Sequence, residues 1–140
     1  MSATPEGLRA EAGRWLQFAV EDLEAAEALR SAPGVVARHV ATLAQQSAEK
    51  AVKAGLVVLD VDPPRTHNLE LLVDLLPDDW AVHESSADLA RLSLWLVESR
   101  YPGEWPETTE SDADLALGAA RDVLARMVAD LSARGVASIA

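Results

Sequence analysis

The chain has 140 residues, 49% of them hydrophobic and 25% charged, which is the balance of a single globular domain over residues 1–140. It contains no cysteine, which excludes disulfide frameworks, thiolate nucleophiles and cysteine-ligated metal sites. Its net charge of −11 repels phosphate backbones, so we expect no non-specific binding of nucleic acid. The N-terminus has no signal-peptide pattern, and no apolar run is long enough to cross a membrane. We therefore expect a cytoplasmic protein without a membrane partner.

Apolar residues recur along the chain at spacings of three and four, which is the period of the α-helix. Two long helices are predicted over residues 8–30 and 35–59, and Pro33 and Gly34 separate them. Apolar side chains cover most of the circumference of the second helix, which predicts a central helix packed on more than one side. Because one small bundle cannot readily cover so much apolar surface, the same pattern predicts a symmetric homodimer.

Three further helices are predicted in the second half of the chain, at residues 67–76, 85–98 and 111–134. Their expected N-terminal caps are Thr66, the capping box of Ser85 and Asp88, and the pair of Ser111 and Asp114. The sequence thus predicts an all-α, up-and-down antiparallel bundle of four long helices and one short helix, with its core over residues 8–134.

Metal and phosphate motifs are missing from the sequence. A di-iron bundle needs Glu-x-x-His pairs, but the residues three positions before the histidines are Val36, Pro64 and Trp80. No glycine-rich phosphate loop and no nucleophile elbow occurs. We therefore expect no metal, no cofactor and no catalytic residue.

The first segment of chemical interest is residues 43–54 on the central helix. Gln46, Lys50 and Lys53 fall at spacings of four and three, so they share a helix face that could hold an anionic ligand. The alternative is structural: Glu49 and Lys53 form an ordinary pair on a solvated stripe.

The second segment, residues 98–107, contains two prolines. It carries Arg100, the only tyrosine of the chain, Tyr101, and Trp105. An arginine and aromatic rings on a stiff loop can clamp a phosphate and stack a base. The alternative is that Tyr101 and Trp105 cap the open end of the bundle core.

Four segments, in this order, resemble the HEPN domain (higher eukaryotes and prokaryotes nucleotide-binding). They are Trp15 with Glu21-Asp22-Leu23-Glu24-Ala25-Ala26, then Gln45-Gln46-Ser47-Ala48-Glu49-Lys50-Ala51-Val52-Lys53-Ala54, then Thr66-His67-Asn68-Leu69-Glu70-Leu71-Leu72, and finally Ser99-Arg100-Tyr101-Pro102-Gly103. The resemblance covers residues 12–131. It implies a helical bundle that forms a homodimer, binds a nucleotide, and works beside a minimal nucleotidyltransferase in a toxin–antitoxin pair.

Several branches of that family are metal-independent ribonucleases with an arginine followed, four to six residues later, by a histidine. In this chain no arginine stands at the required positions before any of the three histidines. The required positions after Arg100 hold Trp105, Pro106 and Glu107. The ribonuclease signature is therefore missing. Asn68 also replaces the acid that commonly follows His67, and it can cap a helix equally well.

The leading hypothesis is a non-catalytic nucleotide- or partner-binding HEPN-like bundle. Its expected ligand-binding residues are Gln46, Lys50, Lys53, Arg100, Tyr101 and Trp105. A second hypothesis is a divergent RNA-cleaving toxin that uses Arg100 as phosphate clamp and His67 or His39 for proton transfer. A third is a purely structural adaptor.

Overall fold

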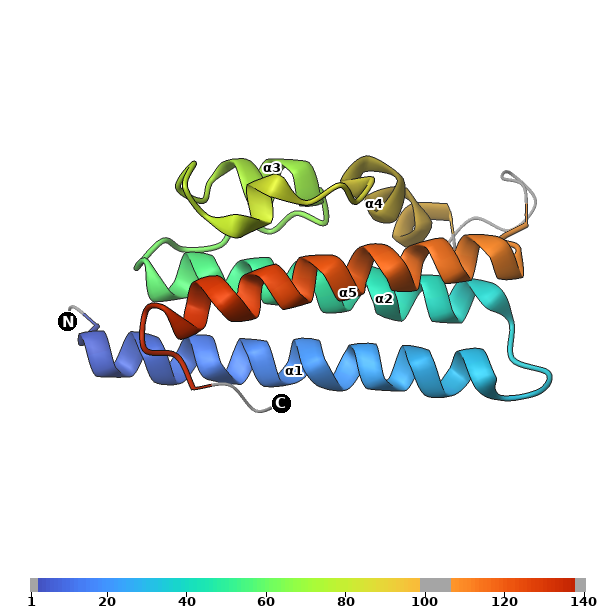
Figure 1. The fold of residues 1–140 in the computed structure, drawn as a ribbon, viewed down its shortest axis with the longest axis horizontal. Helices are drawn as coiled ribbons and strands as arrows, with labels where there is room; N and C mark the ends of the chain where they lie inside the picture. Colours follow the sequence, from blue (N-terminus) through green and yellow to red (C-terminus); the bar gives the residue numbers. More distant parts are fainter. Residues whose placement is uncertain (1–2, 99–106, 138–140) are drawn as a thin grey trace.

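The computed structural model describes residues 3–98 and 107–137, and its regular structure there is entirely helical. The elements are α1 (Pro5–Ser31), α2 (Ala37–Val58), α3 (Leu69–Asp74), the 3₁₀ helix η1 (Ala81–Glu84), α4 (Leu89–Glu98) and α5 (Glu110–Ser132). Figure 1 shows three layers, with α1 on one side, α2 and α5 in the middle, and α3 and α4 on the other side. Within the described residues, no helix is long and apolar enough to span a bilayer. The predicted all-α bundle is confirmed.

The middle of the bundle is α2, which contacts α1, α3, α4 and α5. Its apolar side chains between Val40 and Val57 are almost all buried within the single chain. Small residues allow the neighbouring helices to come close, and the Ser47 hydroxyl donates to the backbone carbonyl of Ala19 on α1 at 2.6 Å. The central position of α2 is thus confirmed. The argument for a dimer from its apolar circumference was wrong, because α1, α3, α4 and α5 already cover it, and dimerisation itself stays a prediction.

The first helix begins three residues earlier than predicted. Thr4 is its N-cap and accepts a hydrogen bond from the Gly7 amide at 2.9 Å. Pro5 occupies the first helical turn, where its missing amide hydrogen costs nothing. The helix therefore starts at Pro5 and not at residue 8.

The third layer is built from shorter helices than predicted. Thr66 does not cap α3, because Asn68 accepts from the Leu71 amide and is the N-cap, and Thr66 accepts from the Asn68 amide instead. The predicted capping box at Ser85 was also wrong. Ser85 follows η1, and its hydroxyl donates a hydrogen bond to Asp122 on α5. The helix α4 begins only at residue 89 and has ten residues.

The last helix has a capping box two residues earlier than predicted. Thr109 accepts from the Asp112 amide at 3.1 Å, and Asp112 accepts from the Thr109 amide at 2.9 Å. Asp114, the predicted cap partner, instead pairs with Arg30 at the end of α1, at 2.7 Å. This pair joins α1 to α5 at one end of the bundle.

Candidate functional site

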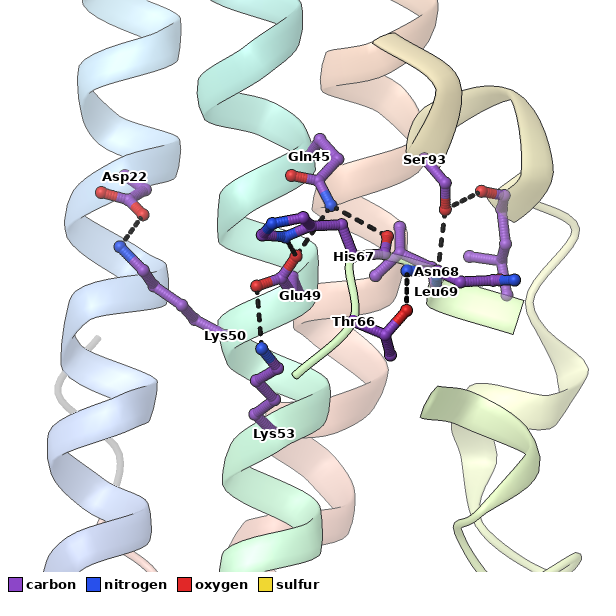
Figure 2. Close-up of polar contacts among 11 residues, drawn as sticks. Asp22, Gln45, Glu49, Lys50, Lys53, Thr66, His67, Asn68, Leu69 and Ser93 are labelled. Atoms are coloured by element: carbon purple, nitrogen blue, oxygen red, sulfur yellow. Dashed lines mark hydrogen bonds and ion pairs between the residues drawn. The ribbon is translucent and has the colours of Figure 1, made fainter. Parts of the chain in front are cut away.

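A buried carboxylate on α2 is the centre of the polar cluster shown in Figure 2. Glu49 is 8% exposed, and each of its two oxygens accepts at least one hydrogen bond. Oε1 accepts from Gln45 Nε2 at 3.1 Å and from His67 Nδ1 at 2.7 Å. Oε2 accepts from Lys53 Nζ at 3.0 Å. We call these four residues the Glu49 cluster.

The Glu49 cluster joins two of the segments that carry the resemblance. Gln45, Glu49 and Lys53 follow one another at spacings of four on α2, so they share one helix face. That face meets the chain just before α3, where Gln45 Nε2 also lies 3.4 Å from the backbone oxygen of His67. The cluster therefore fixes the segment that leads into α3 against the central helix.

The ionised form of Glu49 is favoured by its neighbours. Burial alone would raise its pKa, but the hydrogen bonds from Gln45, His67 and Lys53, with the charge of Lys53, outweigh burial and lower the pKa below its ordinary value. A carboxylate can only accept hydrogen bonds, so Nδ1 of His67 carries the proton in this contact. In the neutral imidazole, Nε2 is then the acceptor, on a side chain that is 52% exposed.

The two predicted lysines point in different directions (Figure 2). Lys50 turns to α1, where its Nζ lies 2.6 Å from Asp22 Oδ2 and 5.9 Å from the centre of the Phe18 ring. Lys53 belongs to the Glu49 cluster. The structural alternative holds in part: the Glu49–Lys53 pair forms as predicted, but it is not solvated, because the two side chains are only 10% and 12% exposed. Gln46, also predicted for the ligand site, is half-buried on α2.

The other three predicted ligand residues, Arg100, Tyr101 and Trp105, lie outside the described residues, and their role stays a prediction. Among the described residues, a groove of about 440 Å³ opens between α4 and α5. Trp95 and the exposed Leu115 are among the residues that line it.

The remaining histidines are not part of the cluster. His39 is exposed on the first turn of α2, and Nε2 of His83 lies 3.1 Å from the backbone oxygen of Leu76. Over residues 3–98 and 107–137, no three histidine or acidic side chains gather as metal ligands do.

Sequence reasoning missed Gln45, Glu49 and His67 as one cluster. The signal was the spacing of four from Gln45 to Lys53, but nothing in the sequence places His67 against that face.

This geometry defines a helical bundle whose central helix carries a buried polar cluster around an ionised carboxylate. The family model of the HEPN domain matches residues 12–131, and the chain belongs to this family. No curated protein matches the chain.

Two solved structures are similar to the chain. TT1696 from Thermus thermophilus is 26% identical with a TM-score of 0.71, and the match covers 84% of this chain and 96% of that one. ST0689, described as an archaeal HEPN homologue, is 28% identical with a TM-score of 0.62, and the match covers 86% of this chain and 97% of that one. The resemblance and the fold that it implied are confirmed.

Proposed function

We propose that this HEPN protein is a non-catalytic module that binds a nucleotide or a protein partner. The observation that carries the proposal is the closed Glu49 cluster. Its carboxylate accepts three hydrogen bonds inside the chain, and the cluster attaches the segment before α3 to α2. Residues held in this way stabilise the fold and leave no free carboxylate to act as a general base.

The proposed nucleotide contact is the ammonium group of Lys50. Its side chain is 28% exposed, and one of its three N–H donors meets Asp22. The other donors are available to a phosphate oxygen, and Gln46 precedes Lys50 by one helical turn. A few such contacts give weak, salt-sensitive affinity, in the range of about 1 µM to 1 mM.

The experiment is a thermal-shift titration against ATP, GTP and a short RNA. We expect millimolar nucleotide to raise the Tm of the wild type and to leave that of Lys50→Ala unchanged. Asp22→Asn is the matched variant, because it breaks the same ion pair but leaves the lysine free. It should keep or strengthen the nucleotide-induced shift. Arg38→Ala, at an exposed arginine near the start of α2, should behave as the wild type.

Two results would contradict the nucleotide site. One is the absence of any shift with the wild type at millimolar nucleotide. The other is an equal nucleotide shift in Lys50→Ala and the wild type. If both Lys50→Ala and Asp22→Asn only lower the Tm, the pair serves the fold, and the third hypothesis, a structural adaptor, is favoured.

For the protein partner, we propose a minimal nucleotidyltransferase, with this chain as the helical component of a toxin–antitoxin-like module. Membership of the HEPN family supports this pairing. A nucleotidyltransferase reading frame beside the gene, and a stable complex of the two co-expressed chains on gel filtration, would support it. Two purified chains that elute separately at micromolar concentration would contradict it.

A second candidate function is RNA cleavage, and the contact between Glu49 and His67 favours it. A carboxylate that holds Nδ1 leaves Nε2 able to take a proton from a ribose 2′-hydroxyl. The leaving 5′-oxygen would need a second proton donor, and no other histidine of the described chain meets the cluster.

Incubation with structured and unstructured RNA, with and without EDTA, separates the two functions. We expect no cleavage above the buffer control. Cleavage that disappears in His67→Ala or His39→Ala would establish the second candidate and overturn the first.

A further inference from the structure

The outer side of α3 is exposed to solvent although it carries two leucines. The inward side of α3 and of the turn that follows it is apolar and buried, and consists of Leu69, Leu72, Val73 and Leu76. Leu71 and Leu75 lie on the other side, one helical turn apart, and are 48% and 47% exposed. Figure 1 shows α3 in the outer layer of the bundle, on the side away from α1. This segment therefore presents more apolar surface than its own chain covers.

The chain around these leucines is acidic and has no compensating cations. Residues 66–90 contain six aspartates and glutamates and no lysine or arginine. Two of the six have partners, since Glu84 lies 4.0 Å from Arg126 and Asp88 accepts from the Arg91 amide. The other four are exposed, and within the described residues their side chains make no hydrogen bond or ion pair; they are Glu70, Asp74, Asp78 and Asp79.

Two of these unpaired carboxylates share the outer side of α3 with the leucines. Glu70 and Asp74 are one turn apart and directly precede Leu71 and Leu75, so an acidic row runs beside an apolar row. We call these four residues the α3 face. The remaining two carboxylates follow at residues 78 and 79 and add negative charge after the end of the helix. The α3 face is complementary to a segment that carries an apolar row beside cations.

The α3 face is held in place from behind. The chain that leads into it is fixed by the contact between His67 and Glu49, and Asn68 caps the helix. The amide of Leu69 donates to Oγ of Ser93 on α4 at 2.9 Å. A surface that is fixed before binding loses less conformational entropy when a partner docks on it. The Glu49 cluster thus also positions the α3 face.

We infer that the α3 face binds a basic amphipathic helix of a protein partner. The apolar side chains of that helix pack on Leu71 and Leu75, and its lysines or arginines meet the carboxylates beside them. The same carboxylates repel a nucleic acid or an anionic bilayer. A second copy of this chain is a poor occupant, because no helix of its described residues carries two unpaired lysines or arginines one turn apart.

This inference goes beyond the proposed function, because neither a nucleotide nor a nucleotidyltransferase enters it. Lys50, the proposed nucleotide contact, turns to α1, whereas the α3 face belongs to the layer on the other side of the bundle (Figure 1). Lys50→Ala should therefore leave binding at the α3 face unchanged. A failure of the nucleotide titration would not affect this surface, and a failure here would not affect the nucleotide site.

The experiment is a fluorescence-anisotropy titration with a labelled synthetic peptide of about 18 residues, long enough to form a helix. The peptide carries leucines at spacings of three and four and lysines beside them. At about 150 mM salt we expect a Kd of about 10–100 µM for the wild type. The variants Glu70→Lys/Asp74→Lys and Leu71→Ser/Leu75→Ser should each weaken binding by at least about tenfold.

Two control variants separate the α3 face from general attraction between a basic peptide and an acidic protein. Glu11→Lys/Glu24→Lys, at two exposed glutamates of α1, changes the net charge by the same amount. Leu115→Ser removes a leucine that is 65% exposed on α5. Both should bind the peptide within about threefold of the wild type, because salt screens distant charges. Circular dichroism checks that every variant remains helical.

A second peptide, with glutamates in place of the lysines, makes the test independent of any loss of folding. It should bind Glu70→Lys/Asp74→Lys at least about tenfold more tightly than it binds the wild type. A lysine peptide that does not bind the wild type at about 1 mM would overturn the inference. So would equal losses in the two charge-reversed variants, or a glutamate peptide that binds the wild type and Glu70→Lys/Asp74→Lys equally.

Discussion

The inner face of α2 and the outer face of α1 have the same helical spacing but different surroundings. On α2, Glu49 has all its partners inside the chain, from Gln45, Lys53 and His67. On α1, Arg14 and Glu21 flank Phe18, and all three side chains are exposed. Spacing therefore shows which residues share a face, and only the neighbouring elements show whether that face serves the fold or is available to a partner.

The largest loss of stability is expected from Glu49→Ala. Removing the carboxylate takes the ion-pair partner from the half-buried Lys53 and one of two acceptors from the buried Gln45. Breaking a buried charged pair in this way costs about 3 kcal/mol of the free energy of unfolding. Urea unfolding measures it, and the Tm should fall by about 10 °C. Glu24→Ala, an exposed glutamate of α1, is the control and should change stability by less than about 0.5 kcal/mol. Equal effects of the two variants would show that the cluster is not part of the core.

A smaller change in stability is expected when two helical glycines are each replaced by alanine. A Cβ on Gly55 of α2 would lie 2.7 Å from Met127 Cε and 2.8 Å from Trp80 Cζ3, whereas one on Gly118 of α5 would meet nothing within 4 Å. Gly55→Ala should therefore destabilise the protein by about 1–2 kcal/mol despite its better helix propensity. Gly118→Ala should stabilise it by about 0.5–1 kcal/mol. Chemical denaturation of both variants checks the pair, and a stabilised Gly55→Ala would contradict the close packing around α2.

The stability that Glu49 contributes should also depend on pH, with a smaller effect. Because the pKa of Glu49 is lowered in the folded protein, its ionised form contributes stability above the unfolded pKa of about 4.3. That contribution is lost as the pH falls through the folded pKa. Glu49→Gln cannot titrate, so the stability difference between wild type and variant should shrink as the pH falls from 6 towards 3. Denaturant midpoints over this range test it. A difference that stays constant would contradict the lowered pKa.

The sequence predicts the helices better than the contacts between them. Periodicity finds the central helix, because burial on several sides requires apolar residues all round. It misses the true caps at Asn68 and Thr109, because several polar residues near each helix start fit the same motif. It also placed Lys50 and Lys53 in one ligand site, although Lys50 pairs with Asp22 on α1 and Lys53 pairs with Glu49 on α2 itself. Such partners are chosen by packing between elements, which a helical period does not contain.

The central claim is that the polar residues of α2 hold the segment before α3 rather than catalyse a reaction. A double-mutant cycle of Glu49→Gln and His67→Ala, measured by urea unfolding, tests it most directly. The 2.7 Å contact predicts a coupling energy of about 1 kcal/mol, with no change in an RNA-cleavage assay that is blank for every variant. Additive effects on stability, together with RNA cleavage by the wild type that both substitutions abolish, would contradict the account.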